Sequence, residues 1–273
     1  MISSIRCVQR TFVRLAVRNV RSSSETSDII RKITKPSATP LLPEIQLHLI
    51  TTECDLWTSS PEHCPVPDPY WAFLWPGGQA LSRFLLDNPS ITKEKNILDI
   101  GSGCGASVIS ALKCGANHVV ANDIDPIALT SVKLNMELNF SEDALVQLLA
   151  KLVYYGNDIL LDHENCYDKQ SIHNFRILCN SMSINSYNFV FDVILIGDLF
   201  YEESIVTRLF NLLGAINKLH PETKILIGDP GRPFLLEHSM LKYLDAVCEY
   251  KLPDSCIEEN YGFSTACVYE FCK

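Results

Sequence analysis

A glycine-rich turn directly after a short apolar run is the feature that most constrains how this 273-residue chain folds. Residues 96–100 (NILDI) predict a buried strand, and residues 101–105 (GSGCG) predict a sharp turn. The small residues over 106–114 predict a helix, which Gly115 ends. A strand, a glycine turn and a helix in this order indicate one unit of a parallel sheet covered by helices.

The rest of the chain continues this alternation. Strands alternating with helices predict an α/β fold, a Rossmann-like, seven-stranded, mostly parallel sheet with helices on both faces. In such a sheet, ligands bind beyond the carboxyl ends of the strands. Residues 44–50 also have a short helical pattern. Further strands are predicted at 118–122, within 146–155, and at 191–196, 224–227, 246–250 and 266–271, and further helices at 79–87, 127–138, 203–219 and 234–243.

The turn is suited to a nucleotide-like cofactor. Gly101 and Gly103 let the backbone bend sharply and approach a ligand, and with Ser102 and Gly105 they lead into the free N–H groups of a helix N-terminus. Such a turn holds either a pyrophosphate or the amino-acid end of S-adenosyl-L-methionine. The GxGxG spacing differs from the GxGxxG of dinucleotide enzymes, and Asp99 would repel a pyrophosphate. Asp99 then either contacts the turn or the cofactor's amino group, or simply caps the turn.

Two carboxylates follow the second strand of the predicted sheet. Asp123 lies 22 residues after Gly101, at the strand end, where a carboxylate accepts hydrogen bonds from both ribose hydroxyls in dinucleotide folds. Asp125 is the alternative ribose ligand, although Asp125-Pro126 also fits a simple cap of the next helix. We favour Asp123.

Several segments together resemble a known family. They are LDIGSGCG at 98–105, ANDIDPIAL at 121–129, DPYWAFLWPGGQALSRFLLDNP at 68–89, IGDLFY at 196–201 and IGDPGRP at 227–233. In combination they resemble the mitochondrial electron-transfer-flavoprotein β-subunit lysine methyltransferases. These are seven-β-strand protein lysine methyltransferases and are similar to bacterial ribosomal protein L11 methyltransferases. The resemblance covers most of 43–161 and 189–272, and residues 162–188 depart from it.

The resemblance implies S-adenosyl-L-methionine as methyl donor, the mitochondrial matrix as location, and lysines of the flavoprotein β subunit as acceptors. It also implies that the DxxY motif, here Asp198 to Tyr201, lines the lysine site. We hypothesise that Asp198 accepts a hydrogen bond from the lysine nitrogen and that Tyr201 donates one or stacks on the lysine stem. A carboxylate, however, also favours the charged ammonium, which is not nucleophilic. The alternative role for Asp198 is a strand-end cap.

Aromatic residues precede the glycine turn. Tyr70, Trp71 and Trp75 are candidates to wall the donor site, because aromatic faces attract sulfonium and ammonium cations. Core packing explains Trp71 equally well. The pair Gly77-Gly78 would let this segment pass close to the cofactor. Residues 228–233 fit either the wall of a substrate channel or a plain strand-to-helix turn.

The N-terminal residues have a different composition. Residues 1–24 are rich in serine, contain no acid and carry arginines at helical spacing, which is typical of a mitochondrial presequence; a disordered basic tail is the alternative. Prolines predict a linker over 25–42, followed by the methyltransferase domain at 43–273. The five arginines are Arg6, Arg10, Arg14, Arg18 and Arg21.

Net charge and hydropathy narrow the partners. The formal charge is −9, and without the five N-terminal arginines it is −9 − 5 = −14. An acidic body disfavours nucleic acid and suits a basic, lysine-bearing protein. No apolar run reaches the length of a membrane span, so no membrane partner is expected. Nothing in the sequence requires more than a monomer.

Residues 162–188 read as a flexible surface insertion, because asparagine and serine are frequent and apolar runs are weak. His163, Cys166, His173 and Cys179 lie in it, but their spacing fits no common zinc pattern, so no metal is expected. The chain's eleven cysteines include no CxxC pair and read as reduced thiols.

Three rival functions remain open on the sequence. In the first, the methyl acceptor is a different protein or a small molecule, because this fold hosts many acceptors. In the second, the chain is a non-catalytic binding partner or chaperone; the intact turn, Asp123 and Asp198 argue against this. In the third, the chain is an NAD-dependent oxidoreductase, which the glycine spacing disfavours.

Overall fold

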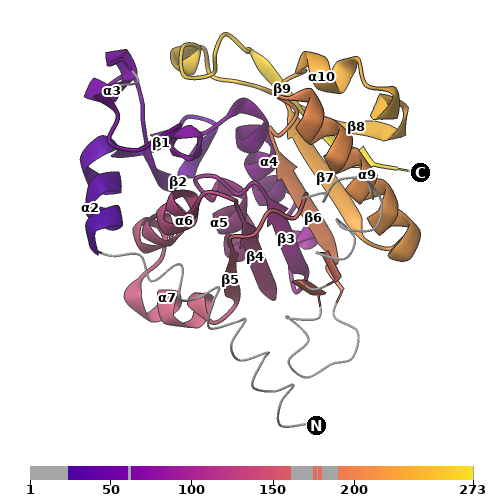
Figure 1. Cartoon of the computed structure of the whole chain (residues 1–273). Coiled ribbons are helices and arrows are strands. Elements are labelled where there is room, and N and C mark those ends of the chain that lie inside the picture. Colours follow the sequence, from indigo (N-terminus) through magenta and orange to yellow (C-terminus); the bar gives the residue numbers. More distant parts are fainter. Residues whose placement is uncertain (1–23, 61–62, 161–174, 177, 180–189, 273) are drawn as a thin grey trace.

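A twisted seven-stranded sheet forms the centre of the computed structural model, which describes residues 24–60, 63–160, 175–176, 178–179 and 190–272 (Figure 1). Its strands are β3 (Asn96–Ile100), β4 (His118–Asn122), β5 (Leu152–Tyr155), β6 (Val193–Gly197), β7 (Lys224–Asp229), β8 (Leu244–Lys251) and β9 (Thr265–Phe271). Their order in the sheet is β5-β4-β3-β6-β7-β9-β8, with β9 antiparallel to both neighbours and the pairs from β5 to β7 parallel. This confirms the predicted fold.

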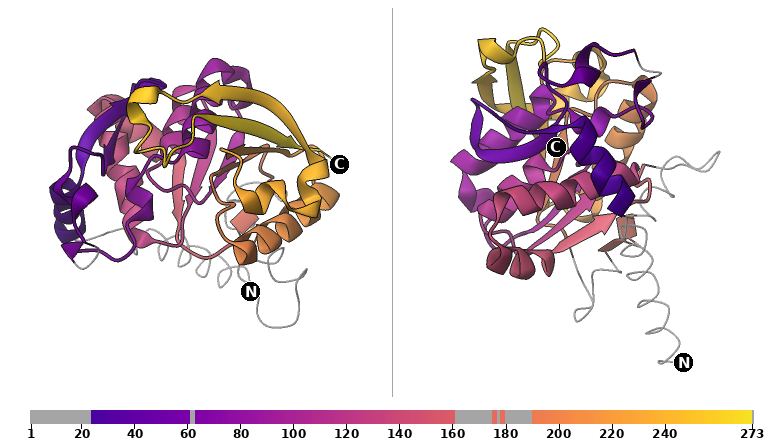
Figure 2. Two further views of the ribbon diagram at one scale, coloured as in Figure 1. Left: turned by 90° about the horizontal axis from the view of Figure 1, so that it is seen from above. Right: turned by 90° about the vertical axis from the view of Figure 1, so that its left-hand side faces the viewer.

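Helices cover both faces because the strands are apolar on both sides. Along β6, Val193 and Leu195 face a layer made by α4 (Pro76–Asp87), α5 (Ala106–Lys113) and α6 (Pro126–Asn139). Ile194 and Ile196 face the other layer, made mainly by α9 (Glu203–Leu219) with α10 (Pro233–Leu236). The sheet lies between these two layers in the views of Figure 2.

The prediction of a linker over 25–42 is wrong. This stretch holds α2 (Ser24–Ile33) and β1 (Lys35–Thr39), and β1 pairs with the antiparallel strand β2 (Leu42–Leu49). Ile30 and Ile33 are buried, so α2 docks on the body of the protein, where it contacts α6. Pro36 is tolerated because β1 is an edge strand of a two-stranded sheet. The folded unit therefore begins before residue 43.

The helical pattern predicted over 44–50 is also wrong, because residues 44–49 lie in β2 and Ile50 directly follows it. Ile45, Leu47 and Leu49 are buried, which is the period-2 pattern of a strand with one covered face. The sheet β1–β2 is fastened to α6 by side chains: Asn135 Oδ1 accepts from the His48 backbone N–H at 2.7 Å.

Other boundaries shift within the predicted regions. The third-strand region 146–155 contains the end of α7 (Glu142–Leu149) and then β5. The helix predicted at 234–243 is divided into α10 and a 3₁₀ turn, Ser239–Tyr243. The shorter elements are α3 (Asp55–Thr58) and the 3₁₀ turns Tyr70–Ala72, Pro89–Ile91 and Asp254–Cys256.

Two predicted segments lie largely outside the described residues, namely the presequence at 1–24 and the insertion at 162–188. Among the described residues of the insertion, Phe175 and Leu178 are buried in the layer of α9, whereas Arg176 is exposed. The ring of Phe175 lies 5.9 Å from that of Phe191, which precedes β6. The insertion therefore contributes side chains to the core.

Candidate functional site

The predicted cofactor turn lies at the carboxyl edge of the sheet, between β3 and α5. Gly101, Gly103 and Gly105 all have left-handed backbone angles, with φ of 68°, 50° and 80°. These angles favour glycine strongly and explain the three glycines of the motif. The backbone N–H of Ser102 donates to the carbonyl of Asn122 at 2.9 Å, which fastens the turn to the end of β4.

Asp123 joins this turn to the second strand end. Its Oδ2 accepts from the Gly103 N–H at 2.9 Å and its Oδ1 from the Asp125 N–H at 3.0 Å. Burial raises the pKa of Asp123, while these N–H groups oppose that shift. Asp125 instead accepts from the Ile127 N–H at 2.7 Å and caps α6, as the alternative reading of Asp125 expected. Of the two acids, Asp123 is the one that lies against the glycine turn.

Asp99 is turned into the protein. It is buried and accepts a hydrogen bond from the Ser107 hydroxyl in the first turns of α5. This contact agrees with the reading of Asp99 as a residue that stabilises the turn. Burial raises the pKa of Asp99 to about 7, although the Ser107 hydrogen bond opposes the shift.

The turn fits the amino-acid end of S-adenosyl-L-methionine. The hydroxyl of Ser102 is buried and has no hydrogen-bond partner among the described residues. A buried hydroxyl of this kind is costly unless something pairs with it. The helix α5 begins directly after the turn, and the first N–H groups of a helix have no partner within the helix. A polar ligand placed over the turn would satisfy both.

The predicted DxxY motif lies beside the same turn. The side chain of Leu199 comes within 2.7 Å of the position that a Cβ on Gly101 would occupy. Asp198 has a left-handed φ of 60°, and its backbone N–H donates to the Gly228 carbonyl at 2.9 Å, next to the end of β7. The glycine turn and the DxxY motif therefore share one edge of the sheet.

Each oxygen of the Asp198 carboxylate accepts a hydrogen bond from the protein. Its Oδ2 accepts from the Gly77 N–H at 2.6 Å, and its Oδ1 accepts from the Nε of Arg232. Burial raises the pKa of Asp198, and the Arg232 charge and the Gly77 N–H oppose this shift. The structure thus places Asp198 in an ion pair, and its predicted contact with a lysine nitrogen stays a prediction.

Sequence reasoning did not single out Arg232. Asp229 Oδ1 accepts from the backbone N–H groups of Gly231 and Arg232, each at 2.7 Å, and so shapes the turn after β7. The guanidinium lies 5.6 Å from the ring centres of Trp75 and Phe263. The signal was the GDPGRP segment, but nothing in the sequence pairs it with Asp198.

Aromatic side chains wall the region around Arg232. Trp75 stacks on Tyr261, with ring centres 4.9 Å apart, and donates its Nε1–H to the Tyr70 carbonyl. Tyr70, Tyr201 and Tyr261 are 62%, 50% and 51% exposed, so their rings are open to a partner. Trp71 is buried in a core cluster, as the packing alternative expected.

Tyr201 lies within electrostatic range of both halves of the site. Burial raises the pKa of its phenol, Glu202, Asp123 and Tyr70 raise it further, and Arg232 lowers it. The phenol of Tyr201 is thus close enough to Asp123 and to Arg232 to be affected by both charges.

The pair Gly77-Gly78 lies where two backbone segments pack closely. A Cβ on Gly77 would lie 2.2 Å from the Gly228 carbonyl oxygen, and a Cβ on Gly228 would lie 2.0 Å from that of Gly77. These glycines bring the start of α4 against the ends of β6 and β7, and their predicted approach to the cofactor stays a prediction.

Known proteins are similar in sequence to this chain over most of its length. The electron transfer flavoprotein beta subunit lysine methyltransferase homolog of Caenorhabditis elegans is 42% identical over 236 residues, 84% of this chain and 89% of that protein. The chain belongs to the electron transfer flavoprotein beta subunit lysine methyltransferase family. The Danio rerio member is 41% identical over 85% of this chain and 78% of its own, and the human member 39% over 86% and 77%.

A family model matches the part of the chain around the glycine turn. Residues 79–162 match the model of ribosomal protein L11 methyltransferase (PrmA). The matched range contains the glycine turn, Asp123 and α5, while Asp198 and Arg232 lie outside it.

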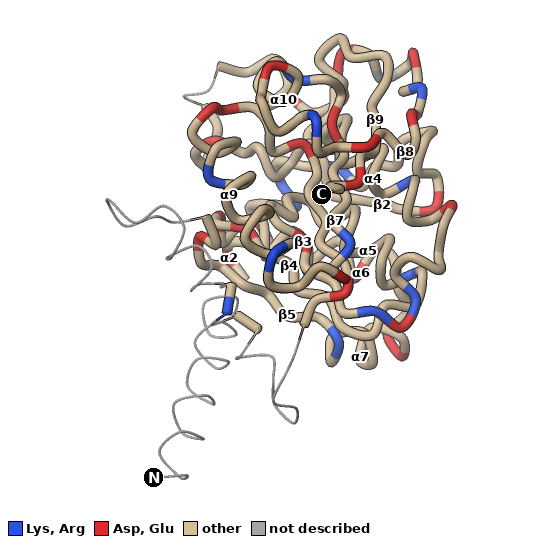
Figure 3. Tube along the Cα trace, turned by 90° about the vertical axis from the view of Figure 1, so that its right-hand side faces the viewer, with Lys and Arg blue, Asp and Glu red and all other residues tan. Residues whose placement is uncertain are grey.

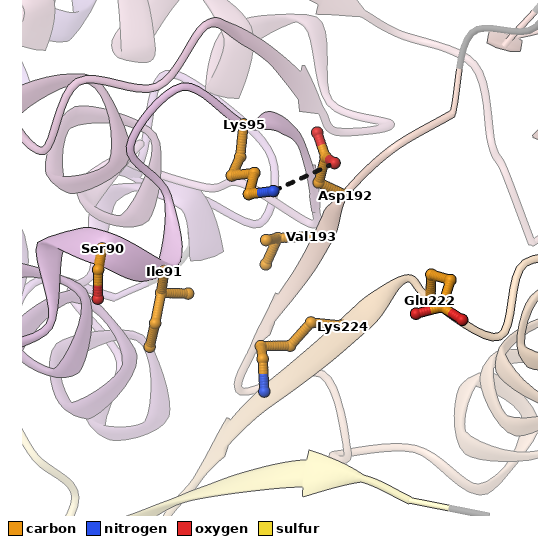
Figure 4. A pocket seen from close by; sticks show the side chains of 7 residues that line it. All are labelled: Ser90, Ile91, Lys95, Asp192, Val193, Glu222 and Lys224. Carbon is orange, nitrogen blue, oxygen red and sulfur yellow. Dashed lines mark ion pairs between the residues drawn. The ribbon is translucent and has the colours of Figure 1, made fainter.

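A hollow of about 320 Å³ lies at the opposite edge of the sheet, near the amino ends of β3, β6 and β7. Figure 4 shows Lys95 directed at Asp192 there, and their charged atoms are 3.7 Å apart. Ligands of open α/β sheets bind at the carboxyl edge, so we do not assign the methyltransferase site to this hollow. Its lining residues are Ser90, Ile91, Lys95, Asp192, Val193, Glu222 and Lys224.

Within the described ranges, no group of three or more histidines, cysteines or acids is arranged to hold a metal ion. His163, Cys166 and His173 lie outside these ranges, whereas Cys179 is buried. Within the same part of the chain, no helix is both long and apolar enough to cross a membrane.

Proposed function

We propose that this protein transfers a methyl group from S-adenosyl-L-methionine to lysines of the electron transfer flavoprotein β subunit. The names of relatives that are 42%, 41% and 39% identical support the acceptor. One observation about the site carries the proposal. Leu199 packs on Gly101 while Asp123 binds Gly103, so the cofactor turn and the DxxY motif meet at one edge.

The donor half of the site holds the cofactor through backbone and carboxylate groups. We assign the amino-acid end to the turn of Gly101, Gly103 and Gly105, with the Ser102 hydroxyl and the N-terminus of α5 as donors. The carboxylate of Asp123 takes the ribose hydroxyls. Asp99 keeps the turn in shape through Ser107. When bound, the cofactor supplies an electrophilic methyl group on a sulfonium.

The acceptor half receives the lysine between aromatic rings. The half-exposed ring of Tyr201 packs along the lysine stem, and Tyr70 and Trp75 form the opposite wall. Asp198 fixes this wall, because it binds both the first turn of α4 at Gly77 and the side chain of Arg232. Holding the amine and the methyl carbon in line supplies most of the acceleration expected for such a displacement.

Surface charge suits a basic protein partner. Acidic and basic residues are interspersed on the side shown in Figure 3, and the chain as a whole carries a formal charge of −9. We further propose that residues 1–24 direct the protein to the mitochondrial matrix, on the composition described above. A fusion of these residues to a fluorescent protein tests this address, and a fusion that stays outside mitochondria would contradict it.

The experiment for the proposed activity uses purified protein, purified electron transfer flavoprotein β subunit and S-adenosyl-L-methionine. Peptide mass spectrometry is expected to find methyl groups on lysines of the β subunit, and fewer of them at limiting donor when Asp123→Ala protein replaces the wild type. If the β subunit stays unmodified while radiolabelled donor marks another protein or a small molecule in a mitochondrial extract, the acceptor is wrong. If nothing is labelled and no donor binds, the activity itself is wrong.

A further inference from the structure

Methyl transfer to lysine requires the neutral amine, but a free lysine has a pKa of about 10.4. A carboxylate that faces the amine alone would raise this pKa further and hold the unreactive ammonium. Asp198 appeared from the sequence to be such a carboxylate. The structure gives it a partner that changes the charge presented to the acceptor.

Arg232 is the less buried member of the ion pair. The side chain of Arg232 is 17% exposed, whereas that of Asp198 is 0% exposed. Solvent therefore reaches part of the Arg232 side chain but not the Asp198 side chain, and we infer that an entering group meets the positive member of the pair first. Because an arginine keeps its charge across the working range of enzymes, an entering ammonium is repelled and a neutral amine is not.

Arg232 is held in this position from several sides. Its backbone N–H donates to Asp229, its Nε donates to Asp198, and the rings of Trp75 and Phe263 flank the guanidinium at 5.6 Å. These four partners lie in four separate parts of the chain. The guanidinium is thus a fixed charge of the site rather than a loose surface side chain.

Four titratable groups of the described residues act on the guanidinium. Asp198 and Asp229 face it from the ends of β6 and β7, and Tyr201 and Tyr261 lie within electrostatic range. Burial raises the pKa of Asp229 to about 7, so this acid offsets the charge of Arg232 only partly near neutral pH. Asp198 forms the direct pair and leaves the guanidinium as the outward group.

We propose that Arg232 keeps the acceptor lysine neutral in the complex with donor, and that the Asp198–Arg232 pair, not Asp198 alone, is the acceptor-side unit. This inference rests on the proposed lysine methyltransferase function. The ammonium loses its proton to solvent on entry. The amine nitrogen then forms a bond to the methyl carbon as the carbon–sulfur bond breaks, so the positive charge passes from sulfur to nitrogen. The methylated ammonium faces Arg232 again, which favours its release.

The test is the pH dependence of single-turnover methylation, measured with the flavoprotein β subunit saturating and the donor limiting. This rate reports the pKa of the amine in the complex, whereas kcat/KM reports the free enzyme and free substrate. The single-turnover rate rises with pH as the amine loses its proton, and this rise is the limb that reports the amine. For Arg232→Gln we expect this limb to move to higher pH by about one pH unit or more. Near neutral pH this is a roughly tenfold or larger loss of rate, while the substrate limb of kcat/KM stays in place.

Arg232→Lys is the matched control, because it retains a positive charge and is expected to keep the wild-type limb. Calorimetric binding of S-adenosyl-L-methionine and thermal unfolding report whether each variant is folded. Asp198→Asn tests the opposite direction. Because it removes the carboxylate charge that neutralises Arg232, its limb is expected to move to lower pH. If Arg232→Gln does not fold, the Asp198→Asn limb decides alone.

An unshifted limb in Arg232→Gln with a lower rate, or a faster reaction at neutral pH, would overturn the proposal. An unshifted limb in Asp198→Asn would overturn it as well. The proposed function fails separately, because in that case the wild-type protein itself leaves the β subunit unmethylated.

Discussion

Gly77 and Gly228 face each other so closely that neither position has room for a side chain. A Cβ on Gly228 would lie 2.0 Å from the Gly77 carbonyl oxygen and 2.9 Å from the Leu81 Cβ. This contact sets the start of α4 against the end of β7. The Gly77 N–H then reaches Asp198, so backbone packing positions the acceptor side of the site.

Gly228→Ala is therefore expected to destabilise the protein by at least about 1–3 kcal/mol, because backbone must move to admit the methyl group. Gly78→Ala is the matched control, since nothing lies within 4 Å of its would-be Cβ and alanine is the better helix former. Urea unfolding measures both. Equal stabilities for the two variants would show that the close contact is not rigid.

The two acids after β4, Asp123 and Asp125, are expected to have different roles, one in donor binding and the other in stability. Asp123→Ala should weaken binding of S-adenosyl-L-methionine by tenfold or more, the order of a lost pair of charge-assisted hydrogen bonds. Asp125→Ala should instead cost about 1 kcal/mol of stability, because it removes the cap of α6, and change binding little. Calorimetry and urea unfolding of both variants check this. A larger binding loss in Asp125→Ala would reverse the assignment.

Asp99 predicts a pH dependence of stability. Its folded pKa is raised from 3.8 to about 7 by burial, so the folded state binds a proton that the unfolded state has lost across that interval. Ionisation of Asp99 therefore lowers the free energy of unfolding as pH rises from about 4 to about 7, by roughly 4 kcal/mol at most.

Asp99→Asn removes this titration and keeps an acceptor for Ser107. The stability of the variant relative to wild type should rise between about pH 4 and pH 7 and level off above, in urea unfolding at several pH values. Asp229 has a similarly raised pKa, but it is present in both proteins and cancels. A difference that is constant with pH would contradict a buried, proton-holding Asp99.

Strong local patterns predicted the donor half of the site. The strand at 96–100, the turn of left-handed glycines and the acid after β4 are encoded within about thirty consecutive residues, and the structure keeps them together. Local patterns failed where tertiary contacts decide. Proline signals suggested a linker at 25–42, yet Pro36 lies in an edge strand paired with His48.

The acceptor half was only partly readable from the sequence. Asp198 was found by its motif, but Arg232 lies 34 residues further along and pairs with it only through the fold. Gly77 and Gly228 likewise meet across α4 and β7, and no periodicity links them. Side chains that are brought together across strands carry no local signal. The sequence therefore indicated a lone carboxylate at Asp198, whereas the structure pairs it with Arg232.

The central claim is that one edge of the sheet binds the donor and aims its methyl group at the acceptor wall. A crystal structure of the complex with S-adenosylhomocysteine tests it most directly. We expect the ribose hydroxyls on the carboxylate of Asp123, the amino-acid end on the turn of Gly101 and Gly103, and the sulfur facing Tyr201 and Arg232. A nucleoside bound in the hollow beside Lys95 and Asp192, or a sulfur directed away from Tyr201, would contradict the account.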